Sequence, residues 1–287
     1  MALALTTPLR VAPDLSKSTH ARGKDWVLYR GDSLALMEQF DDHTFDLVFA
    51  DPPYFLSNGG FTCHGGKRAP VEKGKWDASK GIEEDHAFTS AWLKACQRVL
   101  KPSGTIWVSG TQHVIFNVGF AMQRLGFKLL NTVTWYKPNA SPNLSCRYFT
   151  HSSEILIWAG PGGKGKLKHT FNYPVMKQAN GGKQMRDVWA LPKAGEEEIS
   201  AEGDGKVWTQ LTPRPSEKAH GKHPTQKPIA LLQRIVEASA PEDGLVLDPF
   251  CGSGTTGVAA VSKGCRFVGI DMNPEYLELT RRRIEAL

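Results

Sequence analysis

The tetrapeptide Asp51-Pro52-Pro53-Tyr54 places a carboxylate, a rigid backbone and an aromatic ring in four consecutive positions. It directly follows the apolar run 45–50, which has the composition of a buried strand in a parallel sheet. Proline has no N–H, so nearby carbonyl groups can accept hydrogen bonds from another molecule. A carboxylate and a carbonyl suit the two hydrogens of an amino group, and the ring suits the face of the planar group that carries it. The tetrapeptide therefore predicts a site for a planar molecule with an exocyclic amino group.

A second group of residues lies near the C-terminus, where Gly252, Gly254 and Gly257 have the spacing G-x-G-x-x-G between a predicted strand and a predicted helix. Asp271 ends the next predicted strand, 19 residues after Gly252 (271 − 252). This layout is typical of nucleoside binding, because the glycines permit a tight turn and the acid binds ribose hydroxyls. The motif alone does not separate a nicotinamide dinucleotide from S-adenosylmethionine.

Asp248 ends the strand directly before the glycine turn. A carboxylate there would repel a pyrophosphate, but it tolerates the sulfonium and ammonium groups of S-adenosylmethionine. Ligands of open α/β sheets bind at the carboxyl ends of the strands, so the glycine turn and Asp51 should share one edge. This arrangement predicts methyl transfer from S-adenosylmethionine to an exocyclic amino group.

Length and composition fit an enzyme of this kind. The chain has 287 residues, of which 40% are hydrophobic and 22% charged, so it can bury a sizeable core and is not globally disordered. The formal net charge of +6 mildly favours an anionic partner, although a basic soluble enzyme would also show it. The five cysteines include no C-x-x-C spacing, and no apolar run could span a membrane. We therefore expect no metal site, no membrane partner and a cytoplasmic location.

Changes of composition along the chain divide it into four predicted segments. Between residues 55 and 82 lies a polar, glycine-rich stretch of a length that is usually functional or disordered. The segments are a flexible arm over 1–23, a catalytic half over 24–159 with the loop 55–82, a basic region over 160–221, and a cofactor half over 222–287. Expected strands and helices in the two halves alternate, except for an antiparallel pair over 129–136 and 154–158; 101–104 is expected to be a turn.

The two motifs together resemble the DNA amino-methyltransferases. Their order, with the catalytic motif first and a basic region between, is similar to the beta class, and Gly60-Phe61-Thr62-Cys63 resembles the MboIIA-type branch. The resemblance implies an α/β fold: a circularly permuted, Rossmann-like, S-adenosylmethionine-dependent methyltransferase. It further implies a mostly parallel seven-stranded sheet with an antiparallel hairpin, and a target-recognition region inserted over 160–221.

The resemblance also implies roles for individual residues. Asp51 and the Pro52 carbonyl would hold the amino hydrogens, and Tyr54 would stack on the base. Asp271 would bind the ribose. Asp32 would bind the adenine amino group of the cofactor, although an aspartate at position 32 is also a good helix N-cap. The implied catalytic set is Asp51, Pro52, Pro53 and Tyr54. The implied cofactor set is Asp32, Asp51, Thr225, Lys227, Asp248, Pro249, Phe250, Cys251, Gly252, Ser253, Gly254 and Asp271, with Thr225 and Lys227 at the methionine carboxylate.

Contacts with DNA are expected from basic residues in the long loop, in the region 160–221 and near the segment 135–139, which resembles the part that grips a flipped base. These are Lys67, Arg68, Lys137, Lys164, Lys166, Lys168, Lys183 and Arg186.

The predicted activity is methylation of adenine N6 in duplex DNA after base flipping, because family members with aspartate first in the tetrapeptide are mostly adenine-specific. A cytosine-N4 methyltransferase is the alternative of the same class. A protein glutamine methyltransferase, a DNA-binding relative without catalysis and a nicotinamide dehydrogenase fit less well. A restriction-modification role is expected, with a homodimer and a cognate restriction endonuclease as partner hypotheses.

Overall fold

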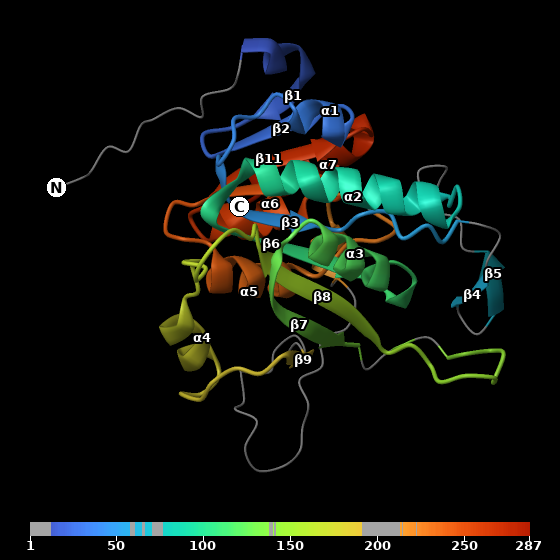
Figure 1. Cartoon of the computed structure of the whole chain (residues 1–287). Helices are drawn as coiled ribbons and strands as arrows, with labels where there is room; N and C mark the ends of the chain where they lie inside the picture. Colours follow the sequence, from blue (N-terminus) through green and yellow to red (C-terminus); the bar gives the residue numbers. More distant parts are fainter. Residues whose placement is uncertain are drawn as a thin grey trace.

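The computed structural model describes residues 13–57, 61–64, 67–70, 77–137, 140, 142–190, 213, 215–221 and 223–287. In these parts of the chain, one sheet has the strand order β1-β2-β11-β10-β3-β6-β8-β7-β9 (Figure 1). Its strands are β1 (Thr19–Arg22), β2 (Trp26–Arg30), β3 (Phe45–Ala50), β6 (Leu100–Gly110), β7 (Lys128–Tyr136), β8 (Ser153–Gly160), β9 (Val188–Ala190), β10 (Leu245–Asp248) and β11 (Arg266–Asp271). A separate antiparallel hairpin contains β4 (Phe61–His64) and β5 (Lys67–Pro70).

Helices cover both faces of this sheet. They are α1 (Ser33–Met37), α2 (Ile82–Val99), α3 (Gln112–Arg124), α4 (Tyr173–Ala179), α5 (Ile229–Ser239), α6 (Thr255–Ser262) and α7 (Pro274–Glu285), with short 3-10 turns η1 (Pro13–Ser18) and η3 (Pro215–Lys218). The buried side chains of α1, α2 and α3 form one core with one face of the sheet, and those of α5, α6 and α7 form a second core with the other face. The chain is therefore a three-layer α/β structure.

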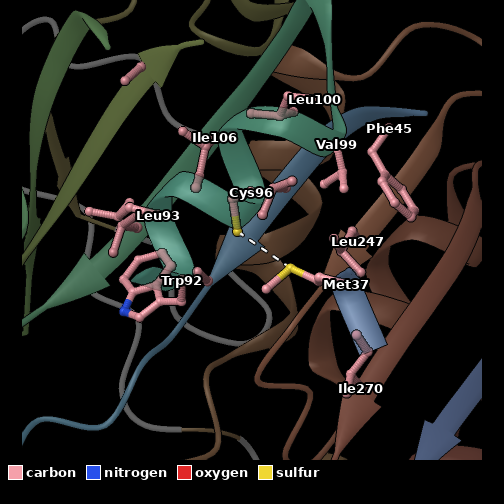
Figure 2. Close-up of a cluster of buried hydrophobic side chains, with 14 of the residues drawn as sticks. Met37, Phe45, Trp92, Leu93, Cys96, Val99, Leu100, Ile106, Leu247 and Ile270 are labelled. Carbon is pink, nitrogen blue, oxygen red and sulfur yellow. Dashed lines mark hydrogen bonds between the residues drawn. The ribbon is translucent and has the colours of Figure 1, made fainter. Parts of the chain in front are cut away.

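Figure 2 shows part of the first core. The Cys96 thiol of α2 approaches the Met37 sulfur of α1 at 3.9 Å. The side chains drawn around this pair come from the same helices and from strands, and include Phe45, Trp92, Leu93, Val99, Leu100, Ile106, Leu247 and Ile270. Because parallel strands are covered on both faces, β3 is apolar along nearly its whole length.

Five neighbouring strands, β2, β11, β10, β3 and β6, are parallel. Although β10 and β11 come last in the chain, they lie between β2 and β3. The carboxyl ends of all five strands therefore meet at one edge of the sheet, which we call the carboxyl edge. The two sequence motifs follow β3 and β10, so this strand order brings them together.

The expected seven-stranded sheet is confirmed as the central part of the observed one. The five parallel strands continue into the antiparallel pair β8 and β7, which matches the predicted hairpin. β1 and β9 add one strand at each side. Residues 101–104, expected to be a turn, belong to β6: between the pairs Phe45–Leu100 and Leu47–Thr105 they form an irregular bulge.

The prediction of a flexible arm over 1–23 is wrong for residues 13–22. Leu15 is buried, and β1 pairs with β2. A short segment without periodicity gives no sign of such tertiary contacts. Residues 1–12 lie outside the described residues. The long loop 55–82 contains the hairpin β4–β5, with Lys67 and Arg68 in β5; residues 58–60, 65–66 and 71–76 are likewise outside the described residues.

The region 160–221 is only partly an insertion. Asn172 donates from its backbone N–H to the Ala238 carbonyl (2.9 Å) and from its side-chain amide to the carbonyls of Glu237 (2.7 Å) and Ala240 (2.9 Å), which ties α4 to the end of α5. Trp189 of β9 is buried in the second core. Residues 172–190 therefore belong to the main body. Within the described ranges, no helix is long and apolar enough to cross a membrane.

The contact between α6 and β11 gives a test of this packing. A Cβ atom on Gly257 would lie 2.5 Å from Cε1 of Phe267 and 2.8 Å from Cδ1 of Ile284. We expect Gly257→Ala to lower the free energy of unfolding by about 1–3 kcal/mol, because an overpacked core must shift. Gly119→Ala in α3 is the matched control, since its Cβ would meet only Ile157, at 3.4 Å. Urea unfolding should show no loss for the control; equal losses in both variants would contradict this account.

Candidate active site

The carboxyl edge carries four aspartates, one after each of four neighbouring parallel strands. Asp51, Asp248 and Asp271 lie at the ends of β3, β10 and β11, and Asp32 follows β2. A cavity of about 540 Å³ opens at this edge, and all four residues line it. The structure thus joins the two sequence motifs in one site, of a size typical for small-molecule binding.

Asp51 has hydrogen-bond donors on both carboxylate oxygens. Oδ1 accepts from the hydroxyl of Tyr54 (2.7 Å) and from Oγ of Ser109 (2.6 Å), which lies near the end of β6. Oδ2 accepts from Nζ of Lys227 (2.6 Å). Three donors from three separate segments therefore fix the orientation of this carboxylate.

The backbone after Asp51 is held by a second carboxylate. Asp77 is fully buried and accepts hydrogen bonds from the backbone N–H groups of Tyr54 (2.7 Å), Phe55 (2.9 Å) and Leu56 (3.2 Å) and from Oγ of Ser57 (3.0 Å). Phe55 has φ of +55°, in the left-handed region that a bulky side chain rarely adopts. Such a conformation persists only when its surroundings enforce it, and Asp77 supplies the enforcing contacts.

The Tyr54 side chain is part of the Asp51 network. The residue is only 7% exposed. Burial, together with the negative charge of Asp51, raises the pKa of Tyr54 well above its usual value, so the phenol stays neutral and donates its proton to Asp51. Lys227 Nζ lies 5.2 Å from the ring centroid and 3.1 Å from the hydroxyl, so the ammonium lies at the hydroxyl end of the ring.

Lys227 comes from the segment before α5, yet it points to Asp51. Its Nζ also lies 3.1 Å from the Tyr54 hydroxyl and 3.6 Å from Oε2 of Glu154, at the start of β8. Burial by itself lowers the pKa of this amine, but the neighbouring acidic groups outweigh that effect and raise the pKa of Lys227 well above its usual value. The side chain is therefore a buried, charged ammonium between two carboxylates.

The glycine turn has the conformation that its sequence predicts. Gly252 has φ of +50° and Gly254 has φ of +71°, in the left-handed region where a side chain is disfavoured. The Asp248 carboxylate holds this turn in place: Oδ1 accepts a hydrogen bond from the Phe250 N–H (3.0 Å), and Oδ2 accepts one from the Thr256 hydroxyl (2.5 Å). Burial raises the pKa of Asp248 to about 7.

Asp271 and Asp32 lie on the cavity side of the same edge. Asp271 accepts from the N–H groups of Gly252 (2.8 Å) and Asn273 (2.8 Å), and burial raises the pKa of its carboxyl group. Asp32 is exposed and accepts from the Ala35 N–H (3.0 Å), so it caps α1. Each carboxylate oxygen can accept a second hydrogen bond, so capping does not prevent either aspartate from binding a ligand.

The cavity has the features that S-adenosylmethionine requires. Asp271 offers carboxylate oxygens beside a turn without a side chain at Gly252, and Asp51 lines the same cavity. The rings of Phe88, Trp92 and Phe250 also line it, and Phe250 contacts the other two. A ligand with a sugar, a flat base and a cationic centre therefore fits the residues present.

The remaining predicted cofactor residues also surround the cavity, apart from Gly254, whose contribution is the turn. Thr225 lines it, and its N–H donates to Nδ1 of His223 (3.3 Å). The Cys251 thiol is buried, and burial raises its pKa well above the usual value, so it is not a nucleophile. The other lining members of the predicted sets are Pro53, Pro249, Phe250, Gly252 and Ser253; Pro52 is buried beside them.

The predicted DNA contacts are scattered. Nζ of Lys137 is paired with Oε1 of Glu154 (2.6 Å), so its charge is engaged within the protein. The region after β8 leaves the sheet at the edge opposite Asp51, because Gly110 pairs with Ile155 at the start of β8. The predicted DNA-contacting residues of that region are all exposed: Lys164, Lys166, Lys168, Lys183 and Arg186. Their contact with DNA stays a prediction.

Sequence reasoning missed three residues of the site. Asp77 lies inside a polar loop and carried no motif, and its role depends on folding back onto residues 54–57. Ser109 and Glu154 were placed correctly on predicted strands, at the ends that reach the carboxyl edge. A polar residue at the edge-facing end of an apolar strand was the signal that could have identified both.

Comparison with known proteins gives concordant matches. A family model described as DNA methylase, of the N6/N4 type, matches residues 45–282. The Type II methyltransferase M2.DpnII of Streptococcus pneumoniae is 47% identical over 260 residues, which is 91% of this chain and 90% of that protein. M2.LlaDCHI of Lactococcus lactis subsp. cremoris is 48% identical over 258 residues, covering 90% and 88% respectively, and M2.MboI of Moraxella bovis is 45% identical over 264 residues, covering 92% and 89%.

Solved structures with the same fold include the complex of M1.HpyAVI with SAM, with a TM-score of 0.59, 21% identity and coverage of 90% of this chain and 98% of that one. The cytosine-N4-specific PvuII DNA methyltransferase has a TM-score of 0.69 with 19% identity, covering 94% and 89%. At such identities the likeness shows the fold alone. It confirms the predicted Rossmann-like methyltransferase fold.

The buried Asp248 gives a test that needs no ligand. Its pKa is about 7 in the folded chain and near 3.8 in the unfolded one, so between these values the folded state binds the proton more tightly. Folding stability therefore falls as pH rises through this window, by at most about 1.4 kcal/mol per pH unit. Asp248→Asn keeps the shape and removes this term. We expect the difference in unfolding free energy, native minus variant, to fall between pH 4 and 7 and then level off; a difference independent of pH would contradict the assignment.

Proposed function

The chain belongs to the N6/N4 DNA methylase family, and we propose that it transfers the methyl group of S-adenosylmethionine to N6 of adenine at a specific sequence in duplex DNA. The observation that carries this proposal is the position of Asp51: its carboxylate lies in the same cavity as the glycine turn and Asp271. An acceptor for amino hydrogens thus stands beside a nucleoside-type site.

A base inside a duplex cannot reach the carboxyl edge, so the target must flip out of the stack, at a cost of a few kcal/mol. Asp51 accepts one hydrogen of its amino group and the Pro52 carbonyl the other, which turns the nitrogen lone pair toward the cofactor side of the cavity. The Tyr54 ring stacks on the base, a contact worth about 1–3 kcal/mol. Asp77 holds these groups in place through the backbone of residues 54–57.

S-adenosylmethionine, when bound, supplies a methyl group that its positive sulfur has already activated. The protein's own part is to position the two reactants and to exclude water. Asp271 binds the ribose hydroxyls, Phe250 and the backbone of Gly252 line the methionine part, and Asp32 accepts from the adenine amino group of the cofactor. Asp248 acts indirectly, because its oxygens are used by the turn itself.

Adenine is favoured over cytosine by the first residue of the tetrapeptide, since relatives with aspartate there are mostly adenine-specific. The Type II designation of the similar proteins supports a restriction-modification role, with a cognate endonuclease that recognises the same sequence. A homodimer and a cytoplasmic location complete the proposal; both come from the family resemblance.

The direct test is to incubate the full chain with mixed-sequence duplex DNA and isotope-labelled S-adenosylmethionine, then to digest the DNA and analyse the nucleosides by mass spectrometry. Label in N6-methyladenine supports the proposal, and the labelled fragments reveal the sequence that is recognised. Label in N4-methylcytosine would move the substrate to cytosine. Cofactor binding without label on DNA would overturn the proposed substrate class.

The role of Asp51 can be tested with an isosteric change. We expect Asp51→Asn to reduce the methyl-transfer rate by on the order of 100-fold or more, because an amide cannot replace the oriented charge. Affinity for S-adenosylmethionine should change by less than about tenfold, or 1.4 kcal/mol. Rate and affinity would be measured by single-turnover labelling and by calorimetry.

Asp46→Asn is the matched control for this variant. Asp46 lies on the same strand, and its carboxylate is also paired with a lysine, Lys101, at 2.8 Å. It should transfer methyl groups at the native rate. Equal loss of rate and of cofactor affinity in Asp51→Asn would mean that Asp51 belongs to the cofactor site.

A further inference from the structure

The buried ammonium of Lys227 competes with the substrate for the acceptor site. Its Nζ donates to Oδ2 of Asp51 at 2.6 Å and lies 3.1 Å from the Tyr54 hydroxyl. Under the proposed function, the target base donates an amino hydrogen to the same carboxylate. Oδ1 already accepts from Tyr54 and Ser109, so a base and Lys227 compete for Oδ2.

A second carboxylate, that of Glu154, lies close to the Lys227 ammonium. Oε2 of Glu154 lies 3.6 Å from Nζ, beyond hydrogen-bond range but within ion-pair range, and the side chain of Glu154 is only 12% exposed. Its other oxygen, Oε1, is held by Lys137 at 2.6 Å, which fixes the carboxylate in place. A shift of about 1 Å would bring Nζ of Lys227 into a full hydrogen bond with Glu154.

We infer that Lys227 is a positioning residue. Its ammonium pairs with Asp51 while no base is bound, and it moves to pair with Glu154 when the target base enters. This inference rests on the proposed function. The transfer keeps the buried ammonium paired throughout, since an uncompensated buried charge is strongly unfavourable. It also moves positive charge away from the amino nitrogen, which itself becomes more positive as the methyl group arrives.

This role differs from the one that the family resemblance implies, in which Lys227 holds the methionine carboxylate of the cofactor. The two roles predict different losses. If Lys227 binds the methionine carboxylate, its loss lowers the affinity for the cofactor. If Lys227 occupies Asp51, its movement controls the rate of methyl transfer after both ligands have bound.

The test is a double-variant cycle with Glu154→Gln and Lys227→Met, using DNA that carries the sequence mapped by the labelling experiment. Glu154→Gln should lower the single-turnover rate at saturating DNA and cofactor by at least about tenfold, because Lys227 then remains on Asp51. Affinity for S-adenosylmethionine should stay within about threefold of the native value, well under 1.4 kcal/mol. The double variant should be faster than Glu154→Gln alone, since no ammonium is left to be relocated.

Asp46→Asn serves again as control, because its carboxylate is as little exposed and also carries a lysine partner. Glu154→Asp, which keeps the charge but withdraws it from Lys227, should have an intermediate rate and provides a second variant if Glu154→Gln unfolds. A fall in cofactor affinity of tenfold or more in Lys227→Met, with no effect of Glu154→Gln on the rate, would overturn the inference. Failure of the proposed function itself would appear differently, as absence of label on DNA from the unaltered chain.

Discussion

A carboxylate buried at the end of a strand must receive hydrogen-bond donors, and the site of this protein is organised by that requirement. Leaving such a group unsatisfied would cost several kcal/mol. Asp51 accepts hydrogen bonds from three separate segments, whereas Asp77 accepts them from residues 54–57 and Asp248 from Phe250 and Thr256. Each carboxylate thereby fixes the geometry of the segments that supply its donors. The hydrogen bonds that burial requires therefore also make the site rigid.

Aspartates at the ends of neighbouring strands use their carboxylate oxygens in different ways. Asp248 directs both oxygens into the turn and holds the backbone. Asp271, one strand away, also bonds the turn but lies at the cavity and remains accessible to a ligand. Asp51 bonds side chains only, and one of these is the long cationic side chain of Lys227. Burial and the kind of donor, rather than the residue type, decide whether an aspartate only supports the fold or keeps an oxygen accessible at the cavity.

Much of the fold could be predicted because its signals are local. The apolar runs that became β3, β10 and β11, the proline at the start of α7 and the G-x-G-x-x-G spacing each act within about ten residues. The buried Leu15, the contact of Asn172 with α5 and the clamp by Asp77 depend on segments far apart in the chain. The same limit applies to Lys227: its sequence neighbours resemble a cofactor motif, but its partner Asp51 lies 176 residues away. The strands and helices after residue 228 were therefore predicted well, and the hydrogen-bond network around Asp51 was not.

The topology also restricts where DNA can lie. Under the proposed function a flipped base contacts Asp51, so the duplex would approach the carboxyl edge. β7 and β9 are parallel, and both end at that edge, since β8 begins there and pairs Ser153 with Tyr136. The described segments that leave the sheet at this edge therefore include those after β3 and β7, together with those after β2, β6, β10 and β11. The loop after β7 presents Tyr148 and Phe149, which are 61% and 96% exposed. Lys164, Lys166 and Lys168 follow β8 and emerge at the opposite edge, so charge alone did not identify the segments that lie beside Asp51.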